Sequence, residues 1–185
     1  MCTRDVQVTE FLLDHGADFG NTLKFIGYSL GFENFGENGR NVIERHTVKL
    51  KALSLFPGPY SGVIDTKFDI FIKNCNGEIE KLKKVGINIH RITFFDVLTM
   101  CQHKLAMRLT NISEDNLALL KKKAKLNFRL YGELVKLHLT KAVRRKNLLI
   151  KANITLTDIF ESALPDTFLR QMFYYFSDQD LKLLS

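Results

Sequence analysis

The sequence predicts an all-α protein, and three observations support this prediction. Apolar residues recur at spacings of three and four along most of the chain, which is the period of a helix that buries one face. Only three prolines interrupt the 185 residues, and fifteen phenylalanines supply bulky side chains for packing between helices. Because 45% of the residues are apolar, the chain can bury a core as one domain, or as one domain with a small appendage.

Neither a membrane span nor a secretory signal is expected. No apolar run approaches the roughly twenty residues that cross a bilayer, and Met1 to Gln7 lack the apolar stretch of a signal peptide. The three cysteines, Cys2, Cys75 and Cys101, show no C-x-x-C spacing, and the last two lie on apolar helical stripes, so both are expected in the core. An intracellular protein, cytoplasmic or nuclear and without a membrane partner, is therefore predicted.

The sequence also argues against catalysis. The histidines include no i, i+4 pair for a metal, and no G-x-S-x-G, H-E-x-x-H or Walker-type loop occurs. Gly36 to Gly39 lacks the flanking strand that a phosphate-binding loop needs. We therefore expect a protein that is not an enzyme and that needs no cofactor or metal.

A helix that ends in a tight turn is predicted for Val6 to Asp18. Val8, Phe11 and Leu12 share one face, and Gly16 suits a left-handed stop. A single amphipathic helix with a glycine cap would explain these residues by itself. The block also resembles the second helix and following loop of an ankyrin repeat.

The resemblance extends over only part of one repeat, which is about 33 residues long. Residues 19–40 are rich in Gly, Asn and Phe and are interpreted as a decayed final repeat with a loop around Gly36 to Arg40. Residues 1–40 are therefore predicted to be a partial, degenerate ankyrin repeat, cut from a longer array.

Residues 41–163 are predicted to form one helical domain, since no Pro- or Ser-rich linker divides them. Thr93 with Asp96 has the spacing of a capping box, and Ser113 suits an N-cap. The first expected helices are Asn41 to Pro57, Asp65 to Lys84, and Thr93 to Leu109 with Cys101 on its buried stripe. Another follows Ser113, and after a turn at Phe128 to Gly132 a last helix runs to about Lys151 and carries Leu134, Leu137, Val143 and Leu148.

Residues 121–151 are strongly basic, with eleven Lys and Arg against Glu133 alone, and account for the net charge of +7. A solvated helix face explains this excess, and an acidic protein surface or a phosphate backbone are alternatives. Only Phe128 and Tyr131 are interleaved as stacking aromatics, and no nucleic-acid motif accompanies them. Nucleic-acid binding is therefore the third-ranked interpretation.

Residues 164–185 are predicted to form two short helices. Pro165 suits a helix start, and Leu169, Met172, Phe173 and Phe176 follow at i, i+3, i+4 and i+7 of one apolar face. A second helix follows, with Ser177 and Asp180 spaced as a capping box. Two helices that simply cover the core of the preceding domain would show the same pattern.

The same segment resembles the opening of an F-box, LPxExLxxIFxYLxxxDLxxL. The residues that fall in register are Leu164-Pro165, Leu169, Met172-Phe173, Tyr175-Phe176, Asp180-Leu181 and Leu184. Thr167 replaces the acidic residue, and the chain stops before a third helix. The chain carries, in this order, an ankyrin-like fragment, His46 to Leu53, Phe94 to Leu98, Leu130 to Gly132 and a truncated F-box. This order resembles that of the PRANC family, which is found in poxviruses, parasitoid wasps and some intracellular bacteria.

The resemblance implies an adaptor that modulates a host cell. In that family, the F-box-like helices bind the small Skp adaptor of SCF ubiquitin ligases, and through it a cullin, while ankyrin repeats hold an unknown target for ubiquitination. The alternative is a ligase-independent module that sequesters a host signalling protein. The predicted partner-binding residues are Leu164, Pro165, Leu169, Met172, Phe173, Phe176, Leu181 and Leu184.

Overall fold

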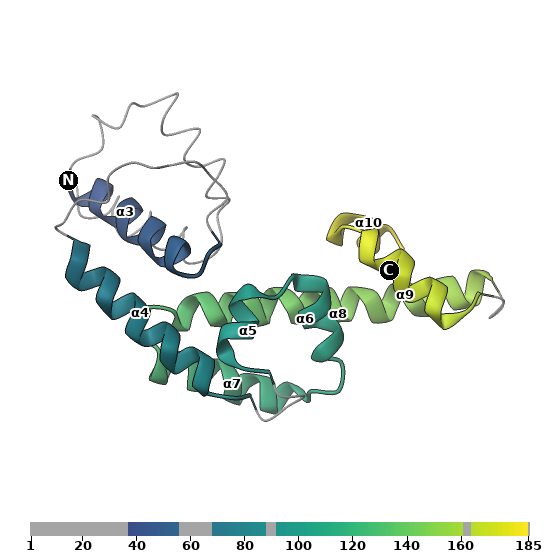
Figure 1. Ribbon diagram of the computed structural model, residues 1–185. Helices are drawn as coiled ribbons and strands as arrows, with labels where there is room; N and C mark the ends of the chain where they lie inside the picture. The colour runs from purple at the N-terminus through teal and green to yellow at the C-terminus, as the bar shows by residue number, and fades with distance from the viewer. Residues whose placement is uncertain (1–36, 56–67, 88–91, 161–163, 185) are drawn as a thin grey trace. The chain divides into compact units, whose positions relative to one another are not determined.

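The described part of the chain is predominantly helical, which confirms the predicted all-α class. A computed structural model describes residues 37–55, 68–87, 92–160 and 164–184. Within these ranges there is no strand, only an isolated antiparallel bridge between Gly86 and Thr93. The helices are α3 (Glu37–Ala52), α4 (Asp69–Lys84), α5 (Phe94–Thr99), α6 (Gln102–Arg108), α7 (Glu114–Asn127), α8 (Gly132–Ile159), α9 (Asp166–Tyr175) and α10 (Asp178–Leu183) (Figure 1).

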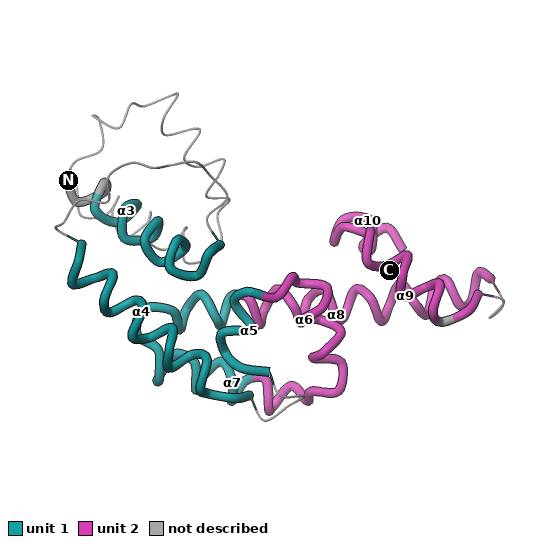
Figure 2. The backbone as a smooth tube through the Cα atoms, in the orientation of Figure 1, with its two compact units in different colours: residues 1–99, 118–137 teal, residues 100–117, 138–185 magenta. Residues whose placement is uncertain are grey.

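The chain divides into two compact units (Figure 2). Unit 1 consists of residues 1–99 and 118–137, and unit 2 of residues 100–117 and 138–185. Helices α7 and α8 contribute residues to both units. The predicted ankyrin-like helix, Val6 to Asp18, lies outside the described residues. In the ranges that are described, no helix is long and apolar enough to cross a membrane.

In unit 1, α4 shows the apolar stripe that the sequence predicts. Phe68, Cys75, Ile79 and Leu82 are buried, and burial raises the pKa of the Cys75 thiol. Cys75 is thus a core residue, as expected. The exposed Gly77 does not interrupt the helix.

Aromatic residues complete the core of unit 1. The rings of Phe94 and Phe128 meet edge to face, with their centroids 5.2 Å apart. Tyr131 is fully buried and donates a hydrogen bond from its hydroxyl to the carbonyl oxygen of Lys49 at 3.2 Å. A buried tyrosine therefore joins the start of α8 to α3 without leaving its hydroxyl unpaired.

Helix α3 differs from its prediction at both ends. It includes Glu37 to Arg40, where a loop was expected, because one glycine inside a helix costs only about 1 kcal/mol relative to alanine. It ends at Ala52, before Pro57. Ser54 has φ 57° and donates its N–H to Lys51 O, while Leu55 N–H reaches Leu50 O, each at 2.9 Å. This is a Schellman motif, which ends the helix without the predicted proline stop.

The predicted helix from Thr93 to Leu109 is two helices. It begins with the predicted capping box: Asp96 Oδ2 accepts from Thr93 N–H at 2.7 Å, and Thr93 Oγ1 accepts from Asp96 N–H at 3.2 Å. It breaks at Cys101, whose backbone is extended (φ −62°, ψ 147°). Thr99 donates to the carbonyl of Phe95, a bond that bends helices. Because of this break Cys101 is exposed, and its predicted place in the core is wrong.

Helix α7 begins at its predicted cap, where Ser113 Oγ accepts from Asn116 N–H at 3.3 Å. Helix α8 continues to Ile159, beyond the predicted end near Lys151, because residues 152–159 contain no proline or glycine that would stop it. Of the four apolar residues predicted on this helix, Leu134 is buried and Leu137, Val143 and Leu148 are half-buried. The buried apolar residues of α8 are Leu134, Val135, Leu139, Ala142, Leu149, Ala152 and Leu156.

Candidate docking site on the C-terminal helices

The two predicted C-terminal helices are present as α9 and α10. Pro165 is the N-cap of α9, one position before its predicted place inside the helix. Ser177 caps α10 through a complete capping box: its Oγ accepts from Asp180 N–H at 3.2 Å, and Asp180 Oδ2 accepts from Ser177 N–H at 2.8 Å. The hydrogen bonds from the Ser177 hydroxyl and then its backbone lower the pKa of Asp180. Local sequence therefore sets this turn.

The structure brings the predicted apolar face together, and most of that face points into unit 2. Leu169, Phe173 and Leu181 are buried in a core cluster with Ala106 of α6 and with Leu149, Ala152 and Leu156 of α8. The half-buried members that pack against this cluster are Leu164, Met172, Phe176 and Leu184. Pro165 is the one predicted residue that is exposed.

A buried arginine of α8 holds the turn between α9 and α10. Only 7% of Arg145 is exposed. Its Nη1 forms an ion pair with Asp178 Oδ1 at 2.6 Å, and its Nη2 donates to the carbonyl oxygens of Phe176 at 2.6 Å and Phe173 at 3.1 Å. The last carbonyls of α9 thus receive a charged donor, which the helix dipole favours.

His103 lies beside this arginine and in turn contacts Tyr174. Arg145 Nη2 lies 3.4 Å from His103 Nδ1, and the His103 ring meets the edge of Tyr174 with centroids 5.4 Å apart. Desolvation, followed by the charge of Arg145, lowers the pKa of His103. Both effects disfavour the protonated ring, and a neutral imidazole can accept a hydrogen bond from the guanidinium.

The sequence did not identify Arg145 as a residue that holds the site. It was one of eleven cations in a basic stretch for which a solvated face was the simplest explanation. Its burial is a correction to that interpretation. A signal is visible afterwards: Arg145 lies at i+3 from Ala142 and at i−4 from Leu149, two buried residues of α8.

Helices α9 and α10 also carry exposed aromatic and aliphatic side chains outside the buried stripe. The exposed fractions are 49% for Phe168, 52% for Tyr174, 83% for Tyr175 and 87% for Leu183. None of these four is among the predicted partner-binding residues, because they lie off the apolar stripe. An amphipathic helix whose polar side carries aromatics is the signal that would have found them.

Comparison with known proteins adds no relative. No protein-family model matches the chain, and neither a curated protein nor a solved structure matches it.

Proposed function

We propose that this chain is an interaction adaptor that binds the Skp subunit of an SCF ubiquitin ligase through α9 and α10, and so directs a target to ubiquitination. The resemblance of residues 164–184 to the opening of an F-box supports the proposal. So does the local structure, a helix beginning after Leu164-Pro165 and a second one capped by Ser177. An adaptor of this kind needs no catalytic residue of its own.

The observation that carries the proposal is the concentration of exposed aromatic side chains at this end of the protein. Among the described residues, every large aromatic side chain that is exposed lies between Phe160 and Tyr175. Aromatic residues are enriched at protein interfaces, where they supply large contact areas and most of the binding free energy. Phe168, Tyr174 and Tyr175 can contact a partner without any change in the fold of unit 2.

Burial of the predicted face defines how such a complex would form. Leu169, Phe173 and Leu181 reach a partner only if α9 and α10 separate from α6 and α8. Separation would break the three hydrogen bonds that Arg145 makes to Asp178 and to the end of α9. Contact through the exposed residues Pro165, Phe168 and Tyr175 avoids this cost. We therefore place the first contact on the exposed face.

One observation favours a second candidate, a ligase-independent module that sequesters a host signalling protein. The burial of Leu169, Phe173 and Leu181 shows that much of the F-box-like stripe already stabilises the chain's own unit. A segment that serves as core does not need a ligase subunit to explain its apolar residues. The sequestering module then uses the exposed aromatic face for another partner.

A calorimetric titration of the chain with purified Skp adaptor tests the proposal. The informative variant is Phe168→Ser with Tyr175→Ser, because both side chains are exposed and the fold should persist. A matched control is Ile70→Ser with Leu126→Ser, exposed by 78% and 74% in unit 1. We expect the first variant to lose at least about tenfold in affinity and the control to bind as the intact chain does.

Phe173 should not be the tested residue, since a substitution in the core would abolish binding by unfolding unit 2. Hydrogen exchange in the complex shows which face is used: faster exchange in α9 on binding would indicate that the helices open. Absence of binding by the intact, folded chain would reject the ligase role and leave the sequestering module.

A further inference from the structure

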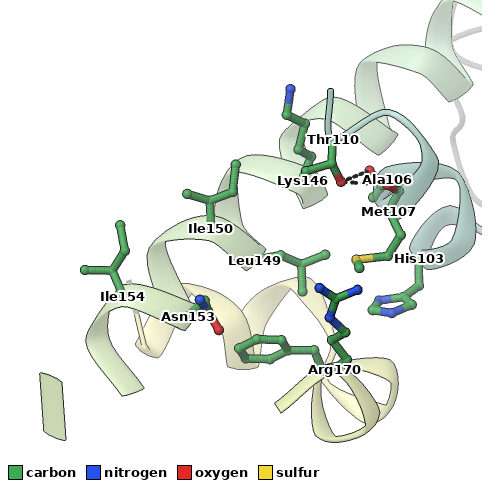
Figure 3. Close-up of a pocket in the computed structure, with 11 residues that line it drawn as sticks. His103, Ala106, Met107, Thr110, Lys146, Leu149, Ile150, Asn153, Ile154 and Arg170 are labelled. Atoms are coloured by element: carbon green, nitrogen blue, oxygen red, sulfur yellow. Dashed lines mark hydrogen bonds between the residues drawn. The ribbon is translucent and has the colours of Figure 1, made fainter. Parts of the chain in front are cut away.

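Unit 2 contains a groove that the proposed adaptor function does not use. It has a volume of about 210 Å³ and lies between α6, α8 and α9 (Figure 3). Ala106, Leu149 and Phe173 are its buried residues. This volume is below the roughly 300–1,000 Å³ of small-molecule sites, and it suits a few side chains of a peptide better than an enclosed ligand.

The walls of the groove are apolar and open to solvent. Ile150 and Ile154 stand one turn apart on α8, with exposed fractions of 44% and 57%. Across from them, Met107 of α6 is 37% exposed. Water-exposed aliphatic side chains on two neighbouring helices are what a third amphipathic helix covers when it packs into a groove.

The charge around the groove is positive. Its lining includes Lys146 and Arg170, and no carboxylate is among the lining residues that the structure describes. The two cations lie on opposite sides of Leu149 (Figure 3). Lys146 Nζ donates to the neutral carbonyl oxygen of Ile112 at 3.2 Å, so this contact leaves the charge of the ammonium available to an anion.

From this geometry we infer that the groove binds an acidic amphipathic helix of a partner protein. Its aliphatic residues pack against Met107, Ile150 and Ile154, and its carboxylates approach Lys146 and Arg170. Charge complementarity of this kind raises specificity and the association rate, while the apolar contacts supply most of the affinity. The net charge of +7 on the whole chain also favours an acidic partner.

Two synthetic peptides of about 18 residues test the charge and the apolar contacts together, since shorter helices are marginal in water. One repeats Leu on one face and Glu on the other, and the second has Lys in place of every Glu. Fluorescence anisotropy with the full chain should give micromolar binding of the Glu peptide. The Lys peptide should bind at least about tenfold more weakly.

Variants of the chain localise the binding. Ile150→Glu should lower the affinity for the Glu peptide at least about tenfold. Leu126→Glu, a change at an exposed residue of unit 1, should leave that affinity unchanged. Lys146→Glu with Arg170→Glu should reverse the preference toward the Lys peptide. Lys122→Glu with Lys141→Glu, two exposed cations outside the groove, changes the net charge equally and should keep the preference for the Glu peptide.

Several results would overturn the inference. Absence of Glu-peptide binding by the folded chain would do so, as would equal binding of both peptides. Loss of binding in Leu126→Glu as large as in Ile150→Glu would place the peptide elsewhere. Binding of dodecanoate without binding of the Glu peptide would assign the groove to a fatty-acid anion, and a dimer that Ile150→Glu dissociates would assign it to a second copy.

Discussion

Arg145 joins α8 to both C-terminal helices of unit 2. A buried guanidinium is stable only when its donors are paired, and here Nη1 and Nη2 bind Asp178 and two carbonyl oxygens. Its buried Nε has no hydrogen-bond partner among the described residues, so the pairing is incomplete. The arrangement contributes to the position of α9 more than to a large net stabilisation.

Replacing Arg145 by methionine should lower the free energy of unfolding by about 2–3 kcal/mol, because the carbonyls of Phe173 and Phe176 lose their donor. Asp178, whose side chain is 40% exposed, can return to water and limits the loss. Urea denaturation measures the effect. Arg144→Met, at an exposed neighbour, is the control and should change stability by less than about 0.5 kcal/mol. Equal effects of the two variants would contradict this role of Arg145.

His46 makes unit 1 sensitive to acid. Burial, followed by the charge of Lys49, lowers its pKa from 6.5 to about 4. The unfolded chain therefore takes up this proton near pH 6.5, whereas the folded chain does so only near pH 4. Stability should fall by up to about 3 kcal/mol as the pH drops through this window, and should not change further below it through this group.

Urea denaturation at pH 6.5 and pH 4.5 measures this loss, and the His46→Leu variant should show a smaller one. The lowered pKa of His103 acts in the same direction and remains in the variant, so the comparison isolates His46. A pKa near 6.5 for His46 in an NMR titration would refute the prediction.

At the scale of elements, the start of α8 depends on a residue 51 to 53 positions earlier in the chain. The carboxylate of Glu78 on α4 accepts from the N–H groups of Arg129, Leu130 and Tyr131, at 3.1, 2.9 and 2.8 Å. These amides precede α8, and a negative charge at the N-terminus of a helix also interacts favourably with the positive end of the helix dipole. A side chain from another helix thus does what a local N-cap does elsewhere.

Glu78→Ala should therefore destabilise unit 1 by about 2 kcal/mol. Glu80→Ala, at an exposed position of the same helix, should have an effect below about 0.5 kcal/mol. Thermal unfolding followed by circular dichroism would compare the two. A loss in Glu80→Ala as large as in Glu78→Ala would mean that removal of a negative charge from α4, and not the remote cap, explains the effect.

Gly77 of α4 and Gly132 of α8 should respond to alanine in opposite directions. A Cβ at Gly132 would lie 2.8 Å from Ala124 O and 3.1 Å from Lys125 Cα, so α7 and α8 would have to separate locally. A Cβ at Gly77 meets nothing within 4 Å. Gly132→Ala should destabilise the fold by about 1–3 kcal/mol, and Gly77→Ala should stabilise it by about 0.5–1 kcal/mol. Chemical denaturation measures both, and the same sign of change in both variants would refute the argument.

Element types were predicted better than element ends. Three predicted caps are present, because capping depends only on a residue and the backbone N–H three positions later. The hydroxyl oxygens that accept from these N–H groups belong to Thr93, Ser113 and Ser177. The break at Cys101 and the length of α8 were missed. The break depends on packing, which decides whether a continuous apolar pattern is one helix or two. The length of α8 follows from the lack of proline and glycine in residues 152–159, a local signal that the prediction did not use.

For the molecule as a whole, the C-terminal helices are part of a core and not an appendage. Removal of residues 164–185 would expose Ala106, Leu149, Ala152 and Leu156. The truncated chain should bind the dye ANS strongly and lose cooperative unfolding, whereas Phe168→Ser with Tyr175→Ser should do neither. Unchanged ANS fluorescence after truncation would contradict the packing. Loss of binding on truncation therefore cannot, by itself, identify the docking residues.

The sequence by itself determined the all-α class, most of the helices and the membership of the C-terminal apolar face, since periodicity and capping are local properties. Tertiary structure alone decided that Leu169, Phe173 and Leu181 are buried against α6 and α8, that Arg145 is buried and that Glu78 caps α8. The physical reason is that spacing along a helix shows which side chains share a face. What covers that face depends on residues distant in the chain, and the sequence pattern does not contain this information.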